Sequence, residues 1–183
     1  MKISADISDS IELRFSKLAR KMNSNGEEII SLGLGEPDFP TPTEIIQAAT
    51  AAMKDGYTRY SNPLGLTELR EKIAIELSRR NGIEAGAEQI IVTPGAKMAL
   101  SLALGALLEP GDEIINITPC YPSYIPQIKI SEPNCKIHNV DLTKSLTLDF
   151  SKIAEKLYSK TKVILLNFPH NPSGKMMQQE DLD

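Results

Sequence analysis

Residues 167–174 read Asn-Phe-Pro-His-Asn-Pro-Ser-Gly, and they directly follow the apolar run Lys162–Leu166. A short run rich in β-branched residues and bounded by turn formers is typical of a buried strand. In an open α/β sheet, ligands bind just beyond the carboxyl ends of such strands. Asn171 therefore stands where an amide held between two prolines can reach a ligand. Standing alone, the stretch would be more typical of a proline-rich turn with capping asparagines, so its interpretation depends on the rest of the chain.

Helical and strand patterns alternate along the chain, which favours a mostly parallel sheet covered by helices on both faces. Thr43 is predicted to cap one helix, and Gly82 to end the next. The predicted helices are 11–22, 43–53, 67–80, 96–108, 123–130 and 150–157, and the predicted strands are 29–32, 89–93, 113–118, 136–140 and 162–166. The fold class is therefore α/β.

The composition is ordinary for a globular protein. The 183 residues carry 20 Lys and Arg against 24 Asp and Glu, a net charge of −4, with the two signs interspersed. Because no basic patch stands out, we expect neither a nucleic-acid nor a membrane partner. The longest apolar stretch, Met98–Leu108, is too short to span a bilayer, and residues 1–10 lack the apolar core of a signal peptide. These features predict a cytoplasmic protein.

The chain has two cysteines, Cys120 and Cys135, and two histidines, His138 and His170. Their spacing does not form a zinc-like cluster, so we expect no metal site. Two cysteines in a chain of this length indicate a reducing compartment rather than a disulfide scaffold. Cys120 has no identifiable histidine or asparagine partner, which argues against a nucleophilic role.

A second candidate site lies at Thr93–Lys97, between a predicted strand and a predicted helix. The first amides of a helix lack intrahelical partners and carry partial positive charge, and Gly95 and Ala96 would let a phosphate approach them closely. No nucleotide-type glycine motif is present, so a single phosphate suits the site better than a polyphosphate. An ordinary strand-to-helix turn, with Lys97 as a solvated charge, is the alternative.

A third candidate site follows the predicted strand 113–118, where Tyr121 and Tyr124 stand close together. An aromatic ring at the carboxyl end of a strand can stack on a planar ligand, which contributes on the order of 1 kcal/mol beyond area burial. The alternative is that both rings serve as core or rim packing.

Together these motifs resemble the class I aminotransferases, the pyridoxal-phosphate enzymes of the aspartate aminotransferase type. The resemblance runs from about Leu13 over nearly the whole chain, and the motifs stand in the family's order. Any one motif is weak, but the ordered set is specific. The matching pieces are residues 33–39, 57–60, 65–70, 93–97, 110–113, 119–121 and 171–174.

The resemblance implies a three-layer α/β/α fold of the pyridoxal-phosphate-dependent transferase type, with a mostly parallel sheet. Residues 1–42 would form an N-terminal arm and part of the small domain, and residues 43–183 the first part of the large cofactor-binding domain. Cis peptide bonds would precede Pro119 and Pro172.

The resemblance also implies how pyridoxal 5'-phosphate would be bound. The main-chain amides of Gly95, Ala96 and Lys97 would hold its phosphate. Tyr121 would stack on the pyridine ring, and Asn171 would donate a hydrogen bond to the phenolic oxygen of that ring.

Two further roles are implied away from the cofactor ring. Gly35 would lie at the substrate carboxylate, and Tyr60 would reach across a homodimer interface to the partner's cofactor phosphate.

Tyr121 stands where the aspartate-specific branch often has tryptophan, and Pro94 is less usual before the phosphate turn. The preferred amino acid therefore stays open.

The family's Schiff-base lysine, the carboxylate that pairs with the ring nitrogen and the arginine that binds the substrate carboxylate would all lie beyond Asp183. We therefore expect no catalytic residue in this chain, which would be the N-terminal part of a longer enzyme and inactive alone. The parent would be an aminotransferase of amino-acid metabolism, in a biosynthetic process, moving an amino group between an amino acid and a 2-oxo acid.

Two other functions stay open at this point. One is different pyridoxal-phosphate chemistry on the same fold, such as a carbon–sulfur β-lyase or a decarboxylase, because the residues available here bind the cofactor rather than select the bond that breaks. The other is a non-catalytic aminotransferase-like module that acts in sensing or assembly.

Overall fold

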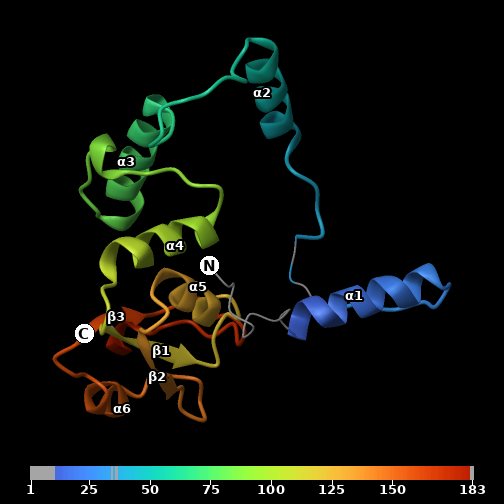
Figure 1. The fold of residues 1–183 in the computed structure, drawn as a ribbon. Coiled ribbons are helices and arrows are strands. Elements are labelled where there is room, and N and C mark those ends of the chain that lie inside the picture. The colour runs from blue at the N-terminus through green and yellow to red at the C-terminus, as the bar shows by residue number, and fades with distance from the viewer. Residues whose placement is uncertain (1–10, 34, 36, 182–183) are drawn as a thin grey trace. The chain divides into compact units, whose positions relative to one another are not determined.

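The computed structural model describes residues 11–33, 35 and 37–181, and it divides into two compact units, one up to Thr93 and one from Pro94 onward (Figure 1). The elements in chain order are α1 (Ile11–Ser24), α2 (Thr43–Lys54), α3 (Thr67–Asn81), the short 3₁₀ helix η1 (Ala87–Gln89), α4 (Ala96–Leu107), β1 (Glu113–Thr118), α5 (Tyr124–Ser131), β2 (Lys136–Asp141), α6 (Phe150–Glu155), β3 (Thr161–Leu165) and the 3₁₀ helix η2 (Gln179–Asp181).

The second unit is built on a parallel sheet with the strand order β2–β1–β3. β1 pairs with β2 along its whole length, from Glu113 opposite Lys136 to Thr118 opposite Asp141. On its other side, β1 pairs in parallel with β3, with one irregularity in register next to Glu113. The predicted parallel sheet is confirmed for these strands, and β1 is its central strand.

Helices cover both faces of this sheet (Figure 1). β1 presents apolar side chains to either face. Ile114 packs with residues of α4 and α5, and Ile115 and Ile117 pack on the opposite face, toward α6. The first cluster comprises Leu104, Leu108, Ile114, Ile128 and Cys135, and the second comprises Ile115, Ile117, Val140, Leu142, Leu148 and Ile153. This arrangement confirms the predicted three-layer α/β/α architecture.

The first unit contains α1, α2, α3 and η1. Arg70 of α3 is buried, and its Nη1 donates to the carbonyl oxygen of Ala87 at 2.9 Å, which ties η1 to the helix. Gly82 ends α3 in the left-handed conformation at φ 65°, as predicted. Glycine is also required at Gly65, where φ is 104° and a Cβ would come within 2.7 Å of Val92 Cβ.

Three local predictions for the first unit are wrong. Residues 29–32 and 89–93 are not strands, because neither run pairs with a strand among the described residues; Val92 N donates instead to the carbonyl oxygen of Leu64. The helix predicted to be capped by Thr43 begins at that residue, but its N-cap is Pro42, whose carbonyl oxygen accepts the first hydrogen bonds.

The division after Thr93 does not test the domain boundary predicted after residue 42, which stays a prediction.

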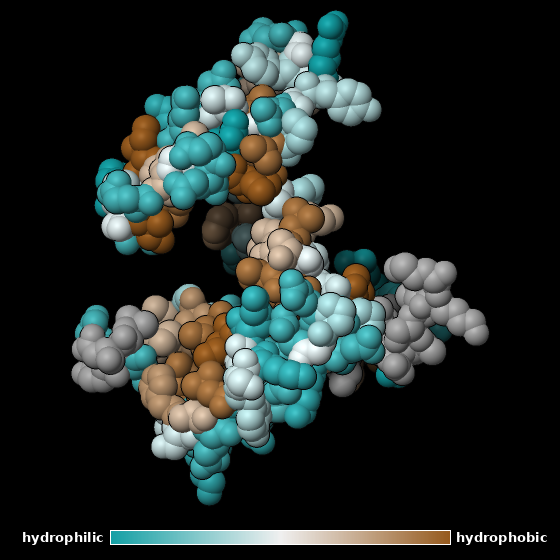
Figure 2. Space-filling view, turned by 60° about the vertical axis from the view of Figure 1, so that its left-hand side comes forward, coloured by the Kyte–Doolittle hydropathy of each residue, from teal (hydrophilic) through white to brown (hydrophobic). Residues whose placement is uncertain are grey.

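Many large apolar side chains are exposed in both units, and apolar patches are visible on the surface in Figure 2. Within the part of the chain that the structure describes, no helix combines the length and the apolar character needed to cross a membrane.

Candidate functional site

Three segments meet beside the carboxyl ends of β1 and β3. Because the two strands are parallel neighbours, the loops that follow them leave the same edge of the sheet side by side. The loop after β1 carries Tyr121, the loop after β3 carries Asn171, and the first turn of α4 carries Lys97. The contacts among these three segments, all in the second unit, define the candidate site.

The first turn of α4 is open. Gly95 is the N-cap, with φ 87° and ψ 167°, and no side chain caps the helix. A Cβ built on Gly95 would have no atom within 4 Å, and Ala96 and Lys97 are exposed. A helix N-terminus lies at the positive end of the helix dipole, which favours an anion. This exposed turn therefore offers space for a phosphate at the positive end of α4.

Lys97 joins this turn to Tyr121, because its Nζ lies 5.3 Å from the centroid of the tyrosine ring. The neighbouring Tyr124 ring meets the Tyr121 ring edge to face, with centroids 5.5 Å apart. Burial, together with the nearby Cys120 and Tyr121, raises the pKa of Tyr124. The partly exposed Tyr121 ring thus interacts with both a cation and a second ring.

Gln127 of α5 donates two hydrogen bonds to α4, one of them to its first turn. Its Nε2 donates to the carbonyl oxygen of Lys97 at 2.6 Å and to Ser101 Oγ at 3.1 Å. Gln127 is buried, so these hydrogen bonds are shielded from water. The orientation of the first turn of α4 is therefore linked to α5, which begins three residues after Tyr121.

The loop that carries Asn171 is closed by its own backbone. Gly174 N donates to the carbonyl oxygen of His170 at 2.6 Å, and His170 N donates to that of Lys175 at 2.8 Å. Asn171 itself is exposed. The peptide bonds before Pro119 and Pro172 are cis, as predicted, and the bond before Pro169 is cis as well.

His170 connects this loop to the loop of Tyr121. The residue is 4% exposed, and its Nε2 lies 2.8 Å from the carbonyl oxygen of Pro119. Its Nδ1 lies 2.6 Å from Ser173 Oγ. From the sequence, His170 was considered only as a possible metal ligand, and this contact was not predicted. The sequence feature that could have indicated a role for His170 is its position inside the 167–174 motif, directly before Asn171.

A second polar side chain that the sequence reasoning missed is Asn116, fully buried in the middle of β1. Its Nδ2 donates to Asn139 Oδ1 at 3.0 Å and approaches Cys120 Sγ at 3.5 Å. It thereby links β1 to β2 and to the residue before Tyr121. The sequence feature that could have indicated its role is a single amide side chain in an otherwise apolar strand, Ile-Ile-Asn-Ile.

Gly35 and Tyr60 belong to the first unit. Both are exposed, and no atom lies within 4 Å of a Cβ built on Gly35. Their implied roles at the substrate and at the partner's cofactor stay predictions.

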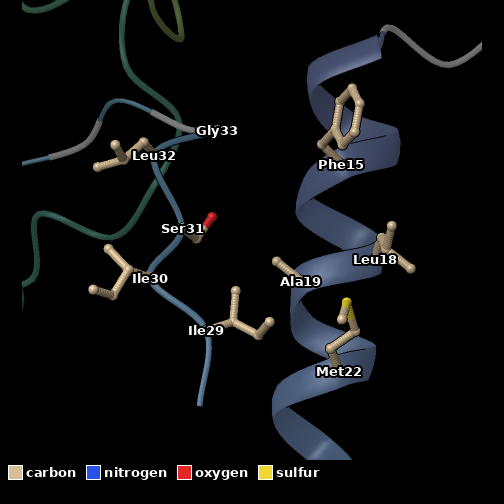
Figure 3. A pocket seen from close by; sticks show the side chains of 9 residues that line it. All are labelled: Phe15, Leu18, Ala19, Met22, Ile29, Ile30, Ser31, Leu32 and Gly33. Atoms are coloured by element: carbon tan, nitrogen blue, oxygen red, sulfur yellow. The ribbon is translucent and has the colours of Figure 1, made fainter. Parts of the chain in front are cut away.

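A separate apolar cleft of about 300 Å³ lies in the first unit, between α1 and residues 29–33 (Figure 3). Ala19 points from α1 toward this segment and Ile29 points back, whereas Ile30 and Leu32 point away from the helix. No titratable side chain is among the described residues that line the cleft, so it lacks the groups for acid–base chemistry.

Comparison with known proteins shows which family the chain resembles. A family model described as aminotransferase class I and II matches residues 27–183. The chain is 37% identical over 177 residues to an aspartate aminotransferase from Thermotoga maritima, covering 97% of this chain and 46% of that protein. It is 38% identical over 167 residues to a probable aspartate aminotransferase from Methanocaldococcus jannaschii, covering 91% of this chain and 44% of that protein.

Among solved structures, an aspartate aminotransferase from Thermus thermophilus with maleate matches with a TM-score of 0.91 and 31% identity, over 96% of this chain and 46% of that one. The chain spans about half the length of the curated relatives it matches. A family model that covers most of the chain and a shared fold lead to one conclusion: the chain belongs to the class I and II aminotransferases, a pyridoxal-phosphate-dependent family.

Proposed function

We propose that the protein carrying this chain is an aminotransferase that moves an amino group between an amino acid and a 2-oxo acid. One observation carries the proposal: the first turn of α4, the loop of Tyr121 and the loop of Asn171 are joined by contacts at one edge of the sheet. Lys97 reaches Tyr121, and His170 reaches Pro119. The three segments that carry the proposed phosphate-binding turn, the aromatic ring and the amide side chain therefore meet at this edge.

The residues present fit pyridoxal phosphate. The open turn at Gly95 suits its single phosphate, and no glycine-rich motif for a longer phosphate chain is present in the sequence. The partly exposed ring of Tyr121 suits a planar heterocycle, and Asn171 is exposed on the adjoining loop. When bound, the cofactor supplies the electron sink for breaking bonds at the substrate Cα.

The chain's own residues would bind and orient that group. The amides of Gly95, Ala96 and Lys97 would hold the phosphate, and Gln127 would fix their position through the carbonyl of Lys97. Tyr121 would cover one face of the ring and exclude water from it. Asn171 would donate from its amide to the phenolic oxygen, which orients the ring in its plane.

We propose aspartate as the preferred amino donor, since the relatives described above are named as aspartate aminotransferases. Gly35 would lie at the substrate carboxylate. We also propose a cytoplasmic homodimer acting in amino-acid biosynthesis, in which Tyr60 reaches the partner's cofactor phosphate and residues 1–42 form the arm and part of the small domain. The complete exposure of the Tyr60 side chain supports a role at an interface.

The test uses the intact protein that contains this chain. It is purified, loaded with pyridoxal phosphate and supplied with 2-oxoglutarate and either aspartate, alanine or tyrosine, and the new amino acid is measured. Glutamate formation, fastest with aspartate, is expected. Pyruvate released from a cysteine-type substrate without amino transfer would instead indicate a β-lyase, and failure to bind the cofactor would refute the proposal.

A further inference from the structure

The tautomer of His170 follows from its partners. The carbonyl oxygen of Pro119 can only accept a hydrogen bond, so the Nε2 atom 2.8 Å away carries the proton. Nδ1 then accepts from Ser173, whose Oγ lies at 2.6 Å and whose backbone N lies at 3.4 Å. Both ring nitrogens thus have hydrogen-bond partners, and Nε2 is the donor to Pro119.

This hydrogen bond joins residues 51 positions apart in the chain. One end is Pro119, two residues before Tyr121, and the other is the residue before Asn171. The ring is almost fully buried, and Phe168 packs beside it with a centroid distance of 5.7 Å. A buried hydrogen bond between two loops restrains their separation, since neither loop can move away without leaving a polar group unsatisfied.

We infer that His170 is a positioning residue: through its Nε2–H bond to Pro119, it sets the distance between the loops of Tyr121 and Asn171. It thereby holds the Asn171 amide where it can donate to the phenolic oxygen of the cofactor. The inference rests on the proposed function, because it concerns how the same site orients pyridoxal phosphate. His170 itself is not placed in contact with the cofactor.

Two substitutions at His170 distinguish the hydrogen bond of Nε2 to Pro119 from the hydrogen bond of Nδ1 with Ser173. Glutamine at this position carries an amide nitrogen near the place of Nε2, so H170Q can keep the donor to Pro119. Asparagine carries its amide near the place of Nδ1, so H170N can keep the contact with Ser173 but not the one with Pro119. S173A is a milder third variant, which removes only the hydroxyl partner of Nδ1 and therefore leaves the ring less firmly oriented.

The readouts are measured on the intact protein loaded with pyridoxal phosphate. The Kd of the cofactor is expected to rise about five- to tenfold in H170N and to stay within about twofold in H170Q. A donor at the phenolic oxygen favours its ionised form, so the pH midpoint of the cofactor's absorbance change should move upward in H170N, by about half to one pH unit. S173A should move it in the same direction by less.

His138 offers a matched control. It is the chain's other histidine and is similarly buried, but its Nε2 meets Glu113 at 2.6 Å, where β1 begins. H138N should lower stability without moving the absorbance midpoint. In the cofactor-free protein, ¹⁵N NMR should show the proton of His170 on Nε2.

Several outcomes would overturn the inference: a proton on Nδ1, an unchanged midpoint in H170N, or equal midpoint shifts in H170N and H138N. If wild-type protein fails to bind the cofactor, the proposed function fails and this inference with it. If wild type binds and H170N behaves like it, only this inference fails.

Discussion

At Gly95, the backbone takes φ 87° and ψ 167°, a region that is essentially reserved for glycine. We predict that G95A lowers the free energy of unfolding by about 1–3 kcal/mol, because alanine must be forced into this conformation even though its Cβ would meet no neighbour. The change also alters the first turn of α4, so cofactor affinity should fall. Urea denaturation and a cofactor titration measure the two effects.

Gly105 in the same helix is the matched control. It has no positive φ, and a Cβ there would also have no atom within 4 Å. G105A should raise the free energy of unfolding by about 0.5–1 kcal/mol, since glycine is a poor residue inside a helix. If both substitutions changed stability in the same direction, the special backbone at Gly95 would not be supported.

Some residues of the candidate site could be predicted from the sequence, and others could not. Tyr121 and Lys97 were identified because each follows a strand or opens a helix, and the structure brings them together. Asn116 and His170 were missed because their roles depend on hydrogen bonds to residues far apart in the chain. Local patterns do not encode such long-range partners.

At the scale of the elements, α4 is stabilised by one buried face. Leu104 is 2% exposed and packs against Ile114 and Ile128, whereas Leu102 is 53% exposed. We predict that L104A lowers the free energy of unfolding by about 2–5 kcal/mol, from lost burial and the cavity left behind. L102A should change it by less than about 0.5 kcal/mol. Comparable losses in the two variants, measured by denaturant unfolding, would contradict this packing.

The short helix α6 depends on its N-cap and gives a pH-dependent prediction. The backbone N–H of Lys152, and then its side chain, bind Asp149 and lower the pKa of that carboxyl group. A lowered folded-state pKa contributes stability above the usual carboxyl pKa of about 3.9, and this contribution is lost as the pH falls through the folded-state value.

D149A should therefore lower stability at neutral pH, and the difference from wild type should shrink as the pH falls below about 4. D149N keeps a cap acceptor without the charge, so it should lie between the two at neutral pH. Thermal unfolding measured from pH 3 to pH 7 tests this. A difference that does not depend on pH would argue against the charged cap.

A strand could be predicted from the sequence where its apolar pattern is matched by a neighbouring strand with which it pairs. The bounds of β1 match the prediction, because a run of apolar residues lies between clear turn residues and is buried on both faces. Residues 29–32 and 89–93 show similar apolar runs but form no strand, since a strand also needs a neighbour to pair with. Apolar pattern alone does not provide that neighbour.

At the scale of the whole molecule, the parallel sheet explains why pieces far apart in sequence form one site. The neighbouring strands β1 and β3 bring two loops to one edge, and the first turn of α4 meets the loop that follows β1. The order of motifs along the chain predicted the family, whereas the assembly of the loops became visible only in the folded chain. We propose that this edge of the sheet binds pyridoxal phosphate.

A crystal structure of the intact protein loaded with pyridoxal phosphate tests this proposal. We expect the phosphate within hydrogen-bonding distance of the amides of Gly95, Ala96 and Lys97, the ring stacked on Tyr121, and the Asn171 amide at the phenolic oxygen. A cofactor bound elsewhere, or a first turn of α4 closed off by other side chains, would contradict it.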